Sequence, residues 1–126
     1  MQSFVTQSVY EDSAFYLMGR GKNSAAANWV QADFQAIDLK VYEQGKPATL
    51  IAQRTLTIAD VIFNALQTDA RWTKDATGYN FRLLTLPADV PDGSKQYVFE
   101  IKFTPTGGAP IFFGVFEVPT LDLHQS

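Results

Sequence analysis

Alternation of apolar and polar side chains is the feature that most constrains the fold. Between Lys95 and Thr104, every second residue is a large apolar or aromatic one. A repeat of two places successive side chains on opposite faces of a β-strand. Residues 33–43 alternate in the same way. We therefore predict two half-buried strands, which need a sheet with one face covered by a core.

Shorter strand-forming runs fill much of the remaining chain, with turn-forming residues between them. We predict further strands at residues 14–18, 49–56, 82–86 and 111–118. The consecutive leucines of the third run favour a strand covered on both faces, and Pro119 is expected to end the last strand. Short, turn-rich connections without strand–helix–strand spacing indicate a mainly β protein, an antiparallel β-sandwich.

One segment follows a different period. Its apolar residues recur at the three- and four-residue spacing of one helical stripe: Ile58, Val61, Ile62, Ala65 and Leu66. Thr57 precedes them and Asp60 follows three residues later, which is the spacing of a capping box with a shorter carboxylate. We predict one short helix, over about residues 58–68, that closes one end of the sandwich.

Composition excludes several kinds of partner. The 126 residues include no cysteine, so disulfides and thiolate metal sites are absent. The net charge is −3 and the basic residues are spread singly, which leaves no basic stripe for a nucleic acid. No run approaches the ~18 apolar residues that span a bilayer, and the first residues lack the pattern of a signal peptide. We expect neither a nucleic-acid nor a membrane partner.

Catalytic and cofactor chemistry has no support in the residues. The single histidine, His124, stands near the end of the sequence with no nucleophile assigned to it. Asp69, Asp75 and Asn80 share one loop, but their spacing does not match a calcium loop, and turn formation is the favoured role. We expect no catalytic, cofactor-binding or metal-binding residues and no enzymatic activity.

Apolar residues on both faces of the final strand leave two interpretations open. The strand is central and covered by the helix, or it offers an apolar patch to another subunit. We expect an amino-terminal arm at residues 1–13, a sandwich domain at 14–118 and a tail at 119–126. The candidate interface residues of the arm, last strand and tail are Phe4, Val5, Val9, Tyr10, Phe112, Phe113, Phe116, Leu121 and Leu123.

Several segments together carry a resemblance to a known family. They are IDLKVYE, then LTIADVIFNALQTDARWTKDATGYNF, a proline-containing turn, YVFEIKFTPTGG and an aromatic last strand, which together cover roughly residues 34–118. In this pattern the chain resembles an immunoglobulin-like structural module of tailed bacteriophages. It is also similar, more loosely, to the amino-terminal domains of phage baseplate proteins.

The resemblance implies a non-enzymatic virion protein, made in the host cytoplasm. It would decorate the capsid or belong to the neck or tail, and would contact other virion proteins and copies of itself. The alternative is a carbohydrate-binding β-sandwich that stacks sugars on exposed aromatic rings, with Trp29, Trp72, Tyr42 and Tyr79 as the candidates. Burial of those rings would count against a glycan partner.

Overall fold

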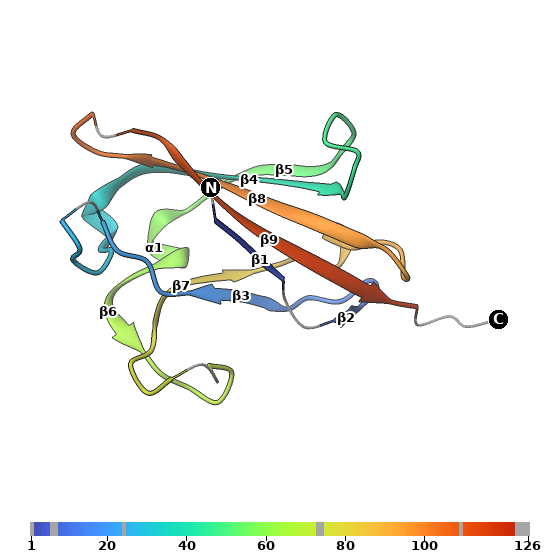
Figure 1. The fold of residues 1–126 in the computed structure, drawn as a ribbon, viewed down its shortest axis with the longest axis horizontal. Helices are drawn as coiled ribbons and strands as arrows, with labels where there is room; N and C mark the ends of the chain where they lie inside the picture. The colour runs from blue at the N-terminus through green and yellow to red at the C-terminus, as the bar shows by residue number, and fades with distance from the viewer. Residues whose placement is uncertain (1, 6–7, 24, 73–74, 109, 123–126) are drawn as a thin grey trace.

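In the computed structural model, residues 2–5, 8–23, 25–72, 75–108 and 110–122 are described, the first of these ranges by its backbone alone. Nine strands in these ranges form two sheets that lie face to face (Figure 1). No described helix has the length and apolar character needed to cross a bilayer. The strands are β1 (Gln2–Val5), β2 (Val9–Tyr10), β3 (Tyr16–Gly19), β4 (Phe34–Glu43), β5 (Leu50–Leu56), β6 (Ile62–Gln67), β7 (Tyr79–Leu84), β8 (Gln96–Pro105) and β9 (Phe112–Leu121).

The larger sheet has the order β1-β9-β8-β4-β5, with β2 also paired to β9, and the smaller has the order β3-β7-β6. All pairs are antiparallel except those of β1 and β2, which run parallel to β9. The expected mainly β sandwich is confirmed. Part of the segment expected as an arm therefore forms an edge of the larger sheet.

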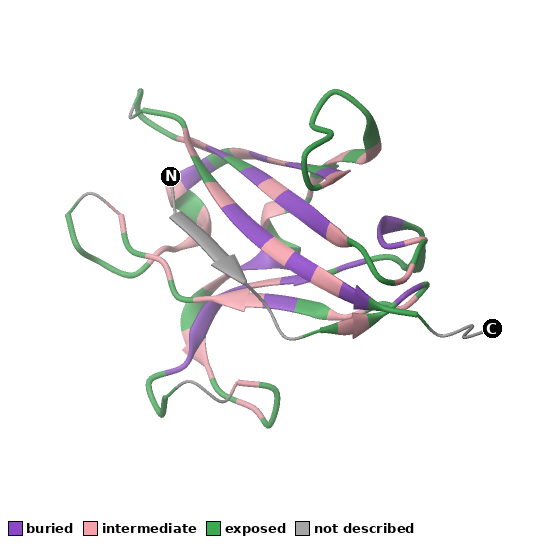
Figure 2. Ribbon diagram, turned by 45° about the vertical axis from the view of Figure 1, so that its right-hand side comes forward, coloured by how far each residue is buried: buried purple, intermediate pink, exposed green. Residues whose placement is uncertain are grey.

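The core lies between the two sheets and follows the predicted alternation. Figure 2 shows buried residues alternating with more exposed ones along the long strands. Buried side chains come from β4 and β8 on one side and from β3, β6 and β7 on the other; they include Leu39, Phe99, Ile101, Leu17, Ile62, Phe81 and Leu83. The two strands predicted from clear alternation, β4 and β8, thus form one side of the core.

The helix is a single turn, α1 (Ile58–Val61), and not the longer element predicted from the stripe. Thr57 is the residue before it, but its side chain makes no capping hydrogen bond. After Val61 the chain extends into β6, and both Val61 and Ile62 are buried. The β-branched and aromatic run of Val61, Ile62 and Phe63 favours a strand over a continued helix.

Pro119 does not end β9, so that prediction was wrong. The N–H of Thr120 donates to the carbonyl of Lys95, the residue just before β8, at 2.7 Å. Neighbouring residues of a strand point their N–H groups to opposite sides, so the nitrogen of Pro119 faces away from β8. On that side β1 pairs as far as Glu117 and β2 begins at Thr120. The missing N–H of Pro119 falls between them, where it costs no ladder hydrogen bond.

Two short 3-10 turns complete the fold, η1 (Gln31–Asp33) and η2 (Pro87–Asp89). Asp89 of η2 is 1% exposed and forms a two-pronged ion pair with Arg54 of β5, with both N–O distances 2.9 Å. Asp89 also accepts a hydrogen bond from the N–H of Leu86 at 2.9 Å. The pair therefore joins the edge strand of the larger sheet to the connection that leaves β7.

Candidate interaction face

The candidate interface residues of the sequence divide between surface and core. Tyr10, Phe113 and Leu121 are 53%, 37% and 44% exposed, and Tyr10 pairs directly with Leu121. Phe4 and Val5 pair in register with Phe116 and Glu117 of β9. Leu123 lies outside the described residues, as does His124. The exposed apolar residues thus lie at separate places along β9 and at the end of β2.

Val9, Phe112 and Phe116, by contrast, pack against the core. Phe116 is 8% exposed and stacks on Phe81 of the opposite sheet at 6.2 Å between ring centroids. Phe112 stacks on Phe103 at 4.9 Å. Val9 and Phe112 both pack against the core. The reason is the strand period, since Phe112 and Phe116 share one face of β9 while Phe113 lies on the other.

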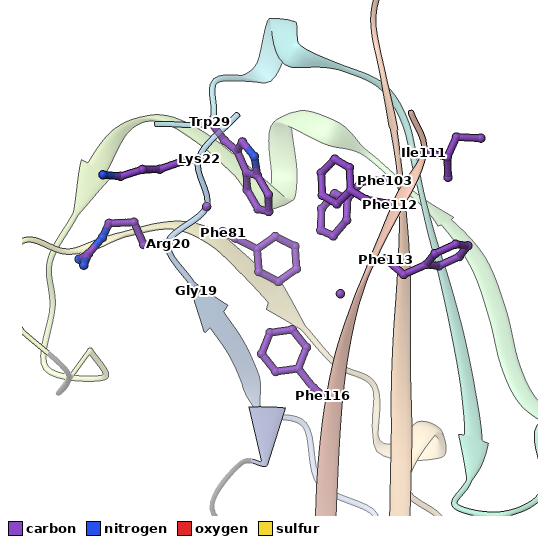
Figure 3. A pocket seen from close by; sticks show the side chains of 12 residues that line it. Gly19, Arg20, Lys22, Trp29, Phe81, Phe103, Ile111, Phe112, Phe113 and Phe116 are labelled. Atoms are coloured by element: carbon purple, nitrogen blue, oxygen red, sulfur yellow. The ribbon is translucent and has the colours of Figure 1, made fainter. Parts of the chain in front are cut away.

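A cavity of about 560 Å³ opens between residues 19–22 and the first half of β9 (Figure 3). Aromatic rings form most of its wall, from Trp29, Phe81, Phe103, Phe112, Phe113 and Phe116. The charged groups among its described lining residues are Arg20 and Lys22, and Figure 3 shows both pointing away from the rings. No carboxylate, histidine or hydroxyl side chain is among the described residues that line the cavity.

The aromatic residues proposed for sugar stacking are engaged within the domain. Tyr79 is 1% exposed and packs against Phe63 and Trp72. Trp29 packs against the core, and its ring lies so close to Gly21 that a Cβ there would be 2.2 Å from it. Tyr42 is half-buried, and its hydroxyl donates to Glu100 at 3.3 Å. Of the four candidate rings, Tyr79 is buried and the other three are half-buried, so the carbohydrate-binding alternative stays a prediction.

The acidic residues of the loop after β6 hold the loop in shape. Asp75 accepts hydrogen bonds from the Trp72 indole and from the N–H groups of Thr77 and Gly78, and pairs with Arg20 at 2.9 Å. These contacts, the Trp72 bond first, lower the pKa of Asp75 to about 2. Asn80 instead bonds the backbone of Gly21. Among the residues described, no three acidic or histidine side chains gather as a metal ion would need.

Asp69 anchors the same loop to the smaller sheet. Its carboxylate pairs with Arg71 at 2.9 Å and accepts the Tyr79 hydroxyl at 2.6 Å. The hydrogen bond from Arg71, followed by that from Tyr79, holds the pKa of Asp69 well below its usual range. Burial, followed by the bond to Asp69, raises the pKa of Tyr79. Asp69 therefore fixes Arg71 against the sheet.

The outer face of the smaller sheet combines arginine with exposed apolar side chains. Leu84 and Leu86 are each 50% exposed and Tyr16, the cross-strand partner of Leu84, is 38% exposed. The expectation that residues 82–86 are covered on both faces was therefore wrong, because Leu83 is buried and Leu84 is not. We call this surface the small-sheet face and define it by Tyr16, Phe63, Arg71, Arg82, Leu84 and Leu86.

Two guanidinium groups stack on one ring of the small-sheet face. The Cζ of Arg71 lies 4.3 Å, and that of Arg82 5.1 Å, from the centroid of the Tyr16 ring. Arg82 also lies 5.1 Å from the Phe63 centroid. Stacking of this kind attracts a cation to the ring face and keeps the planar group in place. The face is thus preorganised by cation–π contacts and the Asp69 anchor.

The outer face of the larger sheet has a different character. The residues of β4 and β8 that alternate with the core include four charged ones, Asp38, Lys40, Glu100 and Lys102, beside uncharged ones such as Tyr42 and Val98. Thr55 of β5 donates to Asp38 at 2.8 Å. Lysine and glutamate are depleted in protein interfaces, whereas tyrosine, phenylalanine and arginine are enriched. The tyrosine, phenylalanine and arginine of the small-sheet face are therefore typical of a contact surface, whereas the four charged residues of β4 and β8 are not.

Comparison with the profiles of known families, with curated protein sequences and with solved structures gives no match. The resemblance to a tailed-phage module therefore stays a prediction.

Sequence reasoning missed the small-sheet face. Its residues come from β3, β6, β7, the loop between the last two and, for Leu86, the connection that follows β7, so mainly the strand pairing brings them together. One feature of the sequence did indicate an exposed apolar face here. Arg82, Leu84 and Leu86 alternate with Phe81, Leu83 and Thr85, so both faces of this strand are largely apolar, and only one of them can line the core.

Proposed function

We propose that this chain is a non-enzymatic structural module of a tailed-phage particle, with an immunoglobulin-like sandwich, on the capsid, neck or tail. It acts through contacts with other virion proteins and with copies of itself. The small-sheet face is the observation that carries the contact role, since an exposed sheet face of tyrosine, leucine and arginine suits a protein partner. The phage setting rests on the sequence resemblance.

Two features support the immunoglobulin-like part of the proposal. In immunoglobulin domains strands B, E and D form one sheet, and strands G, F and C, with C′ in the variable type, form the other. The orders β3-β7-β6 and β9-β8-β4-β5 correspond to these arrangements. Such domains also have a tyrosine near the start of strand F that bonds to backbone just upstream. Here the N–H of Asp92 donates to the Tyr97 hydroxyl at 3.1 Å.

Particle composition tests the proposal. Particles are purified from cells whose genome encodes the chain, and quantitative mass spectrometry compares its copy number with that of the major capsid protein. We expect a fixed ratio that survives repeated density-gradient purification. Absence from particles, together with a protein that sediments as a monomer at all concentrations, would overturn the proposal.

A further inference from the structure

We propose that the small-sheet face recognises an acidic protein segment, one that places an Asp or Glu carboxylate against Arg82 and apolar side chains against Leu84 and Leu86. The inference rests on the contact role proposed above, and it names the chemistry of the partner.

The four arginines of the chain differ in their ionic partners. Arg20, Arg54 and Arg71 each pair with an aspartate at 2.9 Å. Arg82 has no such pair within the described residues. Its Nη1 donates to the Tyr79 hydroxyl at 3.4 Å, and its Nε is buried with no acceptor among the parts of the chain that the structure describes. In a chain with net charge −3, which holds more carboxylates than basic groups, Arg82 is the arginine left for an external acid.

The surroundings of Arg82 hold its guanidinium in place for a ligand. The rings of Tyr16 and Phe63 each lie 5.1 Å from its Cζ. A stacked guanidinium loses little further conformational freedom on binding, and its fork of N–H donors matches the two oxygens of a carboxylate. Arg71 lies over the same Tyr16 ring, but Asp69 already neutralises it. The two arginines therefore have separate roles, since Arg71 supports the ring and Arg82 offers the charge.

The neighbours of Arg82 favour a protein segment over a phosphate polymer. Leu84, Leu86 and Tyr16 present exposed apolar surface beside the guanidinium, which suits apolar side chains flanking the acid. The Asp69 carboxylate on Arg71 and the acidic net charge oppose a polyanion such as a nucleic acid. A segment with a single carboxylate between apolar residues fits the exposed apolar surface beside Arg82 and avoids the repulsion that a polyanion would meet.

Selection from a displayed library of short random peptides tests the inference. Peptides are selected on the wild-type protein, and their affinities are then measured for Arg82→Met and for Lys102→Met. Lys102 is an exposed cation on the outer face of the larger sheet, so its variant controls for loss of one positive charge. We expect the selected peptides to share an Asp or Glu beside large apolar residues.

Such peptides should lose about tenfold or more in affinity on Arg82→Met, as expected for a lost charge-assisted pair, and little on Lys102→Met. Replacing the shared acid of the peptide by its amide should cause the same loss. Arg82→Met loses the cation–π contacts with Tyr16 and Phe63 but breaks no ion pair among the described residues, so we expect it to fold with a slightly lower Tm than the wild type. If it does unfold, Arg82→Lys, which keeps the charge without the planar fork, is measured instead and should also weaken binding.

Peptides without an acid, or acidic peptides that bind Arg82→Met as tightly as wild type, would overturn the inference. A selection on the wild-type protein that enriches no acidic peptide would also overturn the inference. Neutral peptides that lose binding on Leu84→Asp would leave the proposed contact role of the face standing and remove only the acidic partner.

Discussion

Removing the guanidinium of the Arg54–Asp89 pair should strongly destabilise the fold. Arg54→Met keeps most of the volume of the side chain but leaves the Asp89 carboxylate, 1% exposed, with only the Leu86 N–H among its described hydrogen-bond donors. Breaking a buried ion pair from one side costs about 3–5 kcal/mol. Because the Arg54 side chain is 26% exposed and water reaches its outer edge, we expect the lower end, about 3 kcal/mol.

This loss is large for a domain of this size. Unfolding entropy scales with chain length, and for a chain of 126 residues a loss of about 3 kcal/mol corresponds to a fall in Tm of roughly 10 °C. Urea titration followed by tryptophan fluorescence, with Trp29 and Trp72 as probes, measures the free energy of unfolding. A matching thermal melt measures Tm.

The double variant Arg54→Met, Asp89→Leu separates an unpaired charge from lost packing. It removes both charges together, so we expect it to recover most of the stability lost by Arg54→Met alone. The exposed Lys102→Met variant is the control and should stay within about 0.5 kcal/mol of the wild type. A loss under about 1 kcal/mol for Arg54→Met, or a double variant no more stable than the single one, would refute the reasoning.

Two further predictions concern the loop after β6. Gly78 has φ +103°, and a Cβ there would lie 2.3 Å from the Gln67 carbonyl oxygen, so Gly78→Ala should lose about 1–3 kcal/mol in urea titration. Gly19→Ala, with no atom within 4 Å of its Cβ, is the matched control, and equal losses for the two would contradict the explanation. The pKa of Asp75 lies at about 2 in the folded protein, below its ordinary 3.8, so its stabilising contacts are fully present above the ordinary value and are lost as pH falls through about 2. Trp72 fluorescence against pH should show this transition and Asp75→Asn should not; a midpoint near 4 would contradict the low pKa.

Strand period predicted much of the fold because the core strands are amphipathic. β4 and β8 alternate cleanly, and the structure places their apolar residues in the core as expected. The segment from Ile58 to Leu66 was harder, because its apolar residues fit a helical stripe although the run of Val61, Ile62 and Phe63 favours a strand. In the structure Ile62 pairs with Phe81 of β7, and this pairing stabilises a strand, not a helix, from Ile62 onward. The sequence pattern around Ile62 alone cannot reveal a pairing with a residue as distant in the sequence as Phe81.

The surface was less predictable than the core. Apolar residues of β9 were expected at an interface, yet Phe112 and Phe116 belong to the interior and Phe113 does not. A one-residue shift exchanges the two faces of a strand, so the assignment depends on register, which no single strand reveals. Arg82 and Tyr16 stand 66 positions apart in the sequence, and only the pairing of β3 with β7 brings them into contact.

The copy number of the chain in purified particles, compared among three forms, tests the central claim that the small-sheet face makes the contact. The forms are wild type, Leu84→Asp on this face, and Gln53→Asp, an exposed position on β5 of the larger sheet. Both substitutions lie at exposed sites, and thermal melts verify that both variants fold. We expect wild type and Gln53→Asp to be present at one fixed ratio to the major capsid protein and Leu84→Asp to be lost from the particles. Incorporation of Leu84→Asp at the wild-type ratio would contradict the claim.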